Sequence, residues 1–158
     1  MPLDRSWGWS GTAPDLCAAD ITTVVRGLSE HVKDLLGQNP SDSQLDAWVH
    51  SIEMMRRSFE FARRIHQGVD AWQVVLEYEL PLEGGRRPDA LIFAGQALFV
   101  VEFKQAPGFS LANADQVAAY ARDIRDYHSE SRDLQVIPVL ASTAGIIKRR
   151  AFPTIQVA

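Results

Sequence analysis

The spacing of hydrophobic positions predicts two helices in the first half of the chain. Apolar side chains recur every three or four residues over 20–35, and Gly37 follows as a suitable helix stop. A second helix is predicted over 41–68, with Ser41 at its start in a capping-box pattern. Residues 1–15 are rich in Gly, Pro, Ser and Trp, and we expect an irregular lead-in there.

The pattern then changes to the alternation that is typical of strands. A strand is predicted over 72–80, with Glu77 on the face opposite to its aromatic and leucine side chains. Two further strands are predicted over 89–93 and 97–103. Only Gly95-Gln96 separates them, and a turn this short implies an antiparallel hairpin.

A further helix is predicted over 111–128 and a last apolar strand over 134–140. The order helix, helix, strand, strand, strand, helix, strand indicates an α/β fold, with a mixed central sheet flanked by helices. We expect an N-terminal extension and extra helix at 1–40, a core domain at 41–145, and a C-terminal segment at 146–158 that could lead into a longer chain.

Composition narrows the class of protein. The chain has 158 residues, of which 46% are hydrophobic and 23% are charged, as in a soluble globular domain. The lone Cys17 excludes an intramolecular disulfide and a cysteine-based zinc cluster, which favours a cytoplasmic protein. No apolar run reaches the roughly 20 residues of a membrane span, so no membrane partner is expected. The net charge of -4 argues against a protein that coats nucleic acid non-specifically.

One group of polar residues indicates chemistry. Asp89 opens one strand of the predicted hairpin, and Glu102 and Lys104 close the other, so chain reversal should bring them to one end of the sheet. Strand alternation places Glu102 and Lys104 on one face and Phe103 on the other. Two carboxylates suit Mg²⁺, and a neighbouring ammonium can stabilise charge on a phosphate. These residue types in this arrangement suit phosphodiester hydrolysis.

A family resemblance strengthens this interpretation. The runs at 86–92 (RRPDALI) and 100–104 (VVEFK) resemble the motifs of the PD-(D/E)xK nuclease superfamily. Gln116 and Tyr120 are similar to the Gln-x-x-x-Tyr motif of RecB-type nucleases. The order of elements over 41–140, about two-thirds of the chain, also resembles that fold. The resemblance implies a restriction-endonuclease-like core and a metal-dependent nuclease.

A narrower resemblance concerns the larger protein. The runs at 77–81 (EYELP) and 120–123 (YARD), with the Arg-Arg-Pro-Asp run, resemble the N-terminal nuclease-like region of bacterial proteins that continue into a Schlafen-like helicase domain. This implies a module of a DNA-processing or phage-defence protein, with a helicase or ATPase domain in the same full-length chain. Nucleic acid is the expected partner, with DNA favoured over RNA.

The resemblance also implies a set of metal ligands. Asp89 and Glu102 would hold Mg²⁺, for which Mn²⁺ would substitute, and the Phe103 carbonyl would be a further ligand. Some relatives add an acidic residue from a preceding element. Glu77 is the first candidate for that ligand and Glu60 is the second.

The remaining roles that the resemblance implies fall on three residues. Lys104 would position or polarise the attacking water. Gln116 would orient Lys104 or contact the scissile phosphate, and Tyr120 would support that face of the helix. Together with the two acids, these residues form the expected catalytic set: Asp89, Glu102, Lys104, Gln116 and Tyr120.

Plainer interpretations stand beside these. Asp89, Glu102 and Lys104 could form a salt bridge at a strand end, and exposed bridges of this kind contribute roughly 0–1 kcal/mol to stability. Arg86 and Arg87 could contact phosphate or lie in a solvated turn, and Trp7 and Trp9 could stack on bases or pack over the core edge. The alternative function is an inactive nuclease-fold module that binds nucleic acid or a partner protein.

Overall fold

The computed structural model describes residues 7–80, 87–105, 110–127, 133–143 and 156–157 of the chain. Within this part the protein is mixed α/β, with strands and helices interleaved along the sequence. Its elements in chain order are β1 (Trp9–Thr12), α1 (Ala13–Ala18), α2 (Ile21–Leu36), α3 (Asp42–Ile65), the 3₁₀ turn η1 (Gln67–Ala71), β2 (Gln73–Leu76), β3 (Ala90–Ala94), β4 (Ala97–Lys104), α4 (Leu111–Tyr127), β5 (Gln135–Ser142) and β6 (Gln156–Val157).

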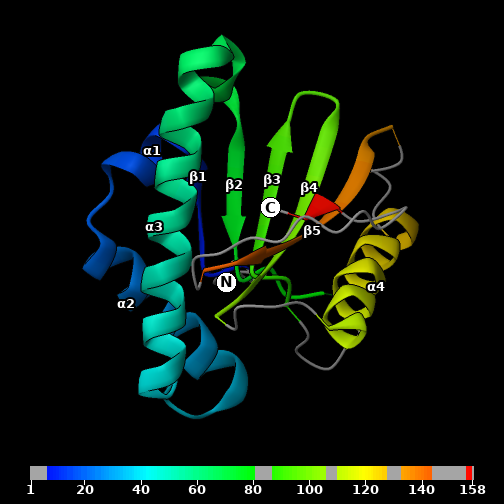
Figure 1. The fold of residues 1–158 in the computed structure, drawn as a ribbon. Coiled ribbons are helices and arrows are strands. Elements are labelled where there is room, and N and C mark those ends of the chain that lie inside the picture. Colours follow the sequence, from blue (N-terminus) through cyan, green and yellow to red (C-terminus); the bar gives the residue numbers. More distant parts are fainter. Residues whose placement is uncertain (1–6, 81–86, 106–109, 128–132, 144–155, 158) are drawn as a thin grey trace, which may run out of the picture.

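The strands form one mixed sheet in the order in which they occur in the chain. The pairs β1–β2, β2–β3 and β3–β4 are antiparallel, and β5 runs parallel to β4 after the crossover through α4. The two-residue β6 extends the sheet beyond β5. Helices α1, α2 and α3 gather at the β1–β2 side, and α4 lies beside β4 and β5 (Figure 1). The predicted mixed sheet flanked by helices is confirmed.

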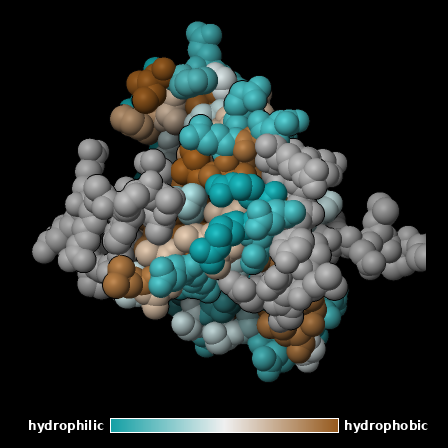
Figure 2. All heavy atoms as spheres, turned by 90° about the vertical axis from the view of Figure 1, so that its right-hand side faces the viewer, coloured by the Kyte–Doolittle hydropathy of each residue, from teal (hydrophilic) through white to brown (hydrophobic). Residues whose placement is uncertain are grey.

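Each face of the sheet buries its own hydrophobic core. Strand residues such as Val74, Ala90 and Val101 pack with the buried stripes of α1, α2 and α3. Their sequence neighbours on the strands, such as Leu91 and Val100, pack with α4 on the other face. Viewed from the α4 side, hydrophilic side chains form a band across the middle of the molecule (Figure 2). Successive strand residues therefore point alternately into the two cores, as expected for a sheet with helices on both faces.

The predicted helix boundaries are largely confirmed. The Asp20 and Ser41 side chains each accept a hydrogen bond from the N–H of the third residue in the helix that follows. Gly37 ends α2 in the left-handed conformation, at φ 73°, which a glycine adopts without steric cost. Helix α3 stops at Ile65, before the predicted boundary at Gly68, because η1 intervenes.

The irregular lead-in predicted over 1–15 is wrong for residues 9–15, and residues 1–6 lie outside the described residues. Residues 9–12 form β1, which pairs with β2, and α1 follows at once. Thr12 starts α1 through a capping box, in which its side chain and that of Asp15 each accept the other's N–H. Trp9 packs against the core, whereas Trp7 is exposed. Four residues with a glycine among them carry too little alternation to reveal a strand whose partner is distant in sequence.

The strand predicted over 72–80 is also too long. Strand β2 ends at Leu76, because Glu77 adopts the left-handed conformation, with φ 55°. After this residue Tyr78 and Leu80 pack on the α4 face, whereas Leu76 packs on the α3 face. The predicted orientation of Glu77 is therefore wrong as well, since its side chain reaches Trp48 of α3.

Candidate active site

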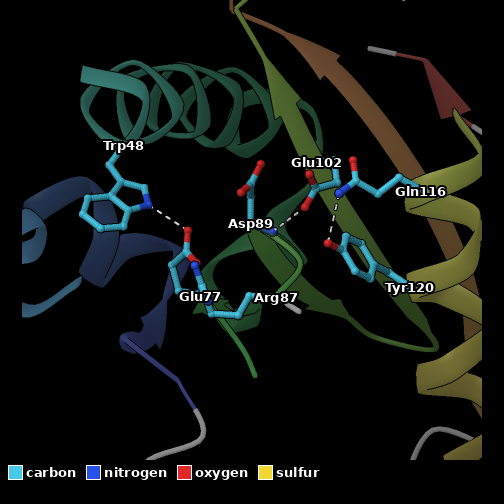
Figure 3. A network of polar contacts seen from close by, with 7 residues as sticks. All are labelled: Trp48, Glu77, Arg87, Asp89, Glu102, Gln116 and Tyr120. Atoms are coloured by element: carbon cyan, nitrogen blue, oxygen red, sulfur yellow. Dashed lines mark hydrogen bonds and ion pairs between the residues drawn. The ribbon is translucent and has the colours of Figure 1, made fainter. Parts of the chain in front are cut away.

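The site lies where β3 begins and β4 ends. The register pairs Ala90 with Val101, so Asp89 stands opposite Glu102 one position further on. The Asp89 N–H donates to Glu102 Oε1 at 3.0 Å, and the Phe103 N–H donates to Asp89 Oδ2 at 2.7 Å. Figure 3 shows the two acids side by side at this junction. The hairpin thus brings the two predicted carboxylates together.

The acids lie across the end of the sheet rather than on one face of it. Glu102 and Lys104 follow the alternation that points Val100 towards α4, and the Phe103 side chain packs on the α3 side, as predicted. Asp89 precedes β3, and it also lines a small cavity beneath α3 together with Trp48. The predicted alternation of Glu102, Phe103 and Lys104 is therefore confirmed, and Asp89 meets Glu102 at the end of the sheet.

Burial and mutual repulsion dominate the electrostatics of the pair. Burial raises the pKa of Glu102 to about 9, and the charge of Asp89 adds to this effect. Burial also raises the pKa of Asp89 to about 7, helped by the charge of Glu77, while the hydrogen bond from Phe103 and the Lys104 ammonium act in the opposite direction. The positive charges of Lys104 and Arg87 therefore do not fully compensate the negative charges that the two carboxylates carry when ionised.

Lys104 is tied to α4 by a chain of side-chain hydrogen bonds. Its Nζ donates to Gln116 Oε1 at 3.3 Å, and Gln116 Nε2 donates to the Tyr120 hydroxyl at 3.1 Å. Tyr120 is buried in the α4 core. The predicted group Lys104, Gln116 and Tyr120 is thus assembled, with the lysine fixed relative to a helix that packs on its own strand.

Glu77, the first candidate for a third ligand, lies beside Asp89 but has both oxygens engaged. Its backbone N–H donates to the Asp89 carbonyl at 3.1 Å. Its buried carboxylate accepts from Trp48 Nε1 at 2.7 Å and from Arg87 Nε at 2.8 Å (Figure 3). Arg87 is therefore ion-paired rather than held in a solvated turn, and Arg86 lies outside the described residues.

Glu60, the second candidate, is not grouped with these acids. It is exposed on α3 and borders a surface depression with Arg63, Arg64 and Asp70. Arg63 and Asp70 form an ion pair at 2.7 Å across this depression. The structure therefore places Glu60 in a solvated charge cluster.

The sequence pattern gave no indication of two neighbours of the site. Trp48 lies in the buried apolar stripe of α3, a pattern that indicates packing alone, although a buried indole N–H generally needs an acceptor. His31 of α2 lies near Arg87 and Glu77, and its Nε2 is buried without a hydrogen-bond partner among the described residues. Burial and the Arg87 charge lower the pKa of His31, which favours the neutral imidazole.

The donor set suits a hard divalent cation that keeps several waters. Asp89 and Glu102 each use one carboxylate oxygen for a backbone N–H, which leaves the second oxygen of each without a hydrogen bond from the described residues. Two carboxylates of this kind are typical of Mg²⁺ sites, where water completes the shell. In the described part of the chain, no group of three or more His, Cys, Asp or Glu side chains is arranged to hold a metal ion.

Helices long and apolar enough to cross a membrane are absent from the described residues.

Comparisons with protein-family models, with curated proteins and with solved structures found no match. The chemistry of the site therefore has to be inferred from the residues of this chain.

Proposed function

We propose that the protein is a metal-dependent nuclease with a restriction-endonuclease-like core. It would hydrolyse phosphodiester bonds, with DNA favoured over RNA as the substrate. The observation that carries this proposal is the arrangement at the end of the β3–β4 hairpin, where Asp89 and Glu102 are hydrogen-bonded to each other's strand. Lys104 extends from the same strand end and is held by Gln116.

In such a reaction each residue of the site would have its own role. Asp89 and Glu102 would hold a divalent ion, which would supply Lewis acidity at a phosphate oxygen and lower the pKa of water. The Lys104 ammonium positions water and stabilises the negative charge that develops on phosphate. Gln116 fixes the direction of that ammonium by accepting from Nζ, and Tyr120 in turn fixes the amide of Gln116. The Phe103 carbonyl remains a proposed further ligand.

The electrostatics of the pair support a cation-dependent role. Two buried acids with raised pKa values are costly to ionise, and a divalent cation between them would remove most of that cost. Acids with strongly perturbed pKa values cluster at functional sites. An ordinary salt bridge at a strand end would instead lower the pKa of its carboxylate.

The proposed core also agrees with the order of elements. From α3 to β5 the described elements run helix, strand, strand, strand, helix, strand, as in the nuclease superfamily that the sequence resembles. We further propose that the chain acts as a module of a DNA-processing or phage-defence protein with a helicase or ATPase domain. This second step depends on the resemblance of the sequence motifs alone.

The direct test is a cleavage assay on single- and double-stranded DNA and RNA. We expect cleavage with Mg²⁺ or Mn²⁺, none with EDTA, and a loss of roughly 10²- to 10³-fold in Lys104→Ala, as when one charge-stabilising donor is removed from an active site. Lys33→Ala, which changes an exposed lysine of α2, is the matched control and should retain full activity. Cleavage that survives EDTA, or that is unchanged in Lys104→Ala, would contradict the proposal.

One observation favours a second candidate, an inactive nuclease-fold module that binds nucleic acid or a partner protein. The engaged carboxylate of Glu77 leaves two acids at the site in the described part of the chain. Calorimetric titration of Mn²⁺ together with a DNA-binding assay separates the two candidates. A chain that binds DNA but not Mn²⁺ would be a binding module.

A further inference from the structure

We propose that Glu77 is a positioning residue, which together with Trp48 and Arg87 forms an anchor that fixes the place of Asp89, and that Glu77 does not bind the metal. The sequence had made it the first candidate for a third ligand. The inference rests on the proposed function only in taking Asp89 as a metal ligand. Its structural part concerns how the backbone at Asp89 is held.

Each oxygen of the Glu77 carboxylate accepts a hydrogen bond from a different element. Oε1 accepts the indole N–H of Trp48, in α3, at 2.7 Å, and Oε2 accepts from Arg87, just before β3, at 2.8 Å. Glu77 is 4% exposed, and the Arg87 side chain is 15% exposed. A rotation of Glu77 towards a metal would leave a buried N–H and a nearly buried guanidinium without this acceptor.

The backbone at Glu77 is held in an unfavourable conformation. Its φ of 55° makes it the one non-glycine residue with positive φ in the described ranges. An L residue pays a steric penalty there, so the surroundings must impose the conformation. The two side-chain bonds are the visible cause, since they hold the carboxylate on the α3 side while the chain turns towards the α4 side.

This turn places the Glu77 N–H against the Asp89 carbonyl, at 3.1 Å. Asp89 is therefore held on one side by Glu77 and on the other by β4, where Glu102 accepts its N–H and the Phe103 N–H binds its carboxylate. Arg87 adds a second link, because it lies two residues before Asp89 and forms an ion pair with the Glu77 carboxylate. The anchor thus joins α3 and the end of β2 to the start of β3.

Amide hydrogen exchange in the metal-free protein tests the anchor without any assay of activity. The amide of Phe103 reports its bond to Asp89, the amide of Asp89 reports its bond to Glu102, and the amide of Val100 in the middle of β4 reports overall stability. In Trp48→Phe we expect the Phe103 and Asp89 amides to lose about tenfold or more of their protection while Val100 keeps its own. Trp72→Phe, between η1 and β2, is the matched control, because its ring packs against Phe59 of α3 and not against Glu77, and it should leave both reporters unchanged.

Mn²⁺ titration separates positioning from ligation. Trp48→Phe should weaken Mn²⁺ binding by about 10- to 100-fold, as substitutions of residues that support a metal ligand do. Glu77→Gln should weaken Mn²⁺ binding by no more than that. Asp89→Asn should remove the binding. Loss of Mn²⁺ binding in Glu77→Gln with protected Phe103 and Asp89 amides would make Glu77 a ligand and overturn the inference.

Two further outcomes are decided by the exchange data. Arg87→Gln provides a second variant if Trp48→Phe fails to fold. It should lower the protection of the Phe103 and Asp89 amides from exchange. Unchanged protection in both Arg87→Gln and Glu77→Gln would overturn the anchor. If the wild-type protein bound no Mn²⁺, the proposed function would fail, and the amides would still show whether the anchor holds Asp89.

Discussion

At the scale of single residues, the site is defined by two acids that are costly to ionise. Asp89 and Glu102 are held by reciprocal contacts with the backbone, and burial raises the pKa values of both. Lys104 lies close enough to act on both acids, yet it does not return either pKa to its ordinary value. The metal-free protein should therefore show the cost of these charges in its stability.

The first prediction concerns pH. The pKa of Asp89 is raised from 3.8 to about 7 and that of Glu102 from 4.5 to about 9, so the folded state binds more protons than the unfolded state between about pH 4 and pH 9. Stability of the metal-free protein should fall as pH rises through this window, because the folded state must release protons that the unfolded state has already lost. Urea denaturation in EDTA at pH 5 and pH 9 measures the change.

Glu102→Gln is the control for that measurement. Glutamine keeps an oxygen that can accept the Asp89 N–H but does not titrate, so the fall in stability between the two pH values should shrink. An equal fall in both proteins would show that other groups cause the pH dependence.

The second prediction concerns Tyr120. Tyr120→Phe removes the hydroxyl that accepts from Gln116 Nε2, while the ring stays in the α4 core. We expect cleavage turnover to fall about three- to tenfold, in line with one neutral hydrogen bond, with little change in substrate affinity. Steady-state kinetics measure both quantities. Unchanged turnover would show that Gln116 needs no support from Tyr120.

The residues of the site were predictable to the extent that they depend on local geometry. A two-residue turn fixes the hairpin register, and this brings Asp89 and Glu102 together from sequence alone. Gln116 was found through a motif on one helix. Trp48 and His31 were not found, because the bond of Trp48 to Glu77 and the effect of the Arg87 charge on His31 both come from distant elements. Within their own helices, both residues look like ordinary packing positions.

At the scale of elements, helix ends were easier to predict than strand ends. Gly37 and Ser41 carry local capping chemistry, and both occur where the sequence placed them. The end of β2 depends on the conformation of one residue, Glu77, which its bonds to Trp48 and Arg87 impose. The apolar residues that follow continue an alternating pattern, so the sequence alone predicted a longer strand.

The third prediction compares two glycines of the same element. Gly37→Ala should destabilise the protein by about 1 kcal/mol, because φ is 73° and an L residue is strained there although space for a Cβ exists. Gly27→Ala should instead stabilise by about 0.5–1 kcal/mol, since it lies within α2 and a Cβ there meets only an ordinary contact at 3.7 Å. Thermal unfolding of both variants gives the comparison, and equal signs would contradict it.

At the scale of the whole molecule, the sheet separates two cores and the site lies where they meet. Glu102 and Lys104 face α4, while Asp89 and Glu77 border the cavity under α3. The general α/β architecture followed from the alternation of patterns along the sequence. The addition of β1 and α1 to one edge did not, because the pairing of β1 with β2 joins segments about sixty residues apart.

The fourth prediction links metal binding to the stability of the whole protein. Mn²⁺ at about 100 times its dissociation constant should stabilise the fold by roughly 2.7 kcal/mol, because the ion binds the native state only. Thermal melts at pH 8 with and without Mn²⁺ measure this effect. The stabilisation should disappear in the Asp89→Asn, Glu102→Gln double variant, and its persistence there would place the ion elsewhere.

The most direct test is a crystal structure of the protein with Mn²⁺, using anomalous scattering to locate the ion. The proposed site predicts a peak between the Asp89 and Glu102 carboxylates, with ligand oxygens at about 2.0–2.2 Å and water in the remaining positions. Glu77 should remain bound to Trp48 and Arg87. An anomalous map without a peak between those two carboxylates, at a Mn²⁺ concentration that supports cleavage, would contradict the proposal.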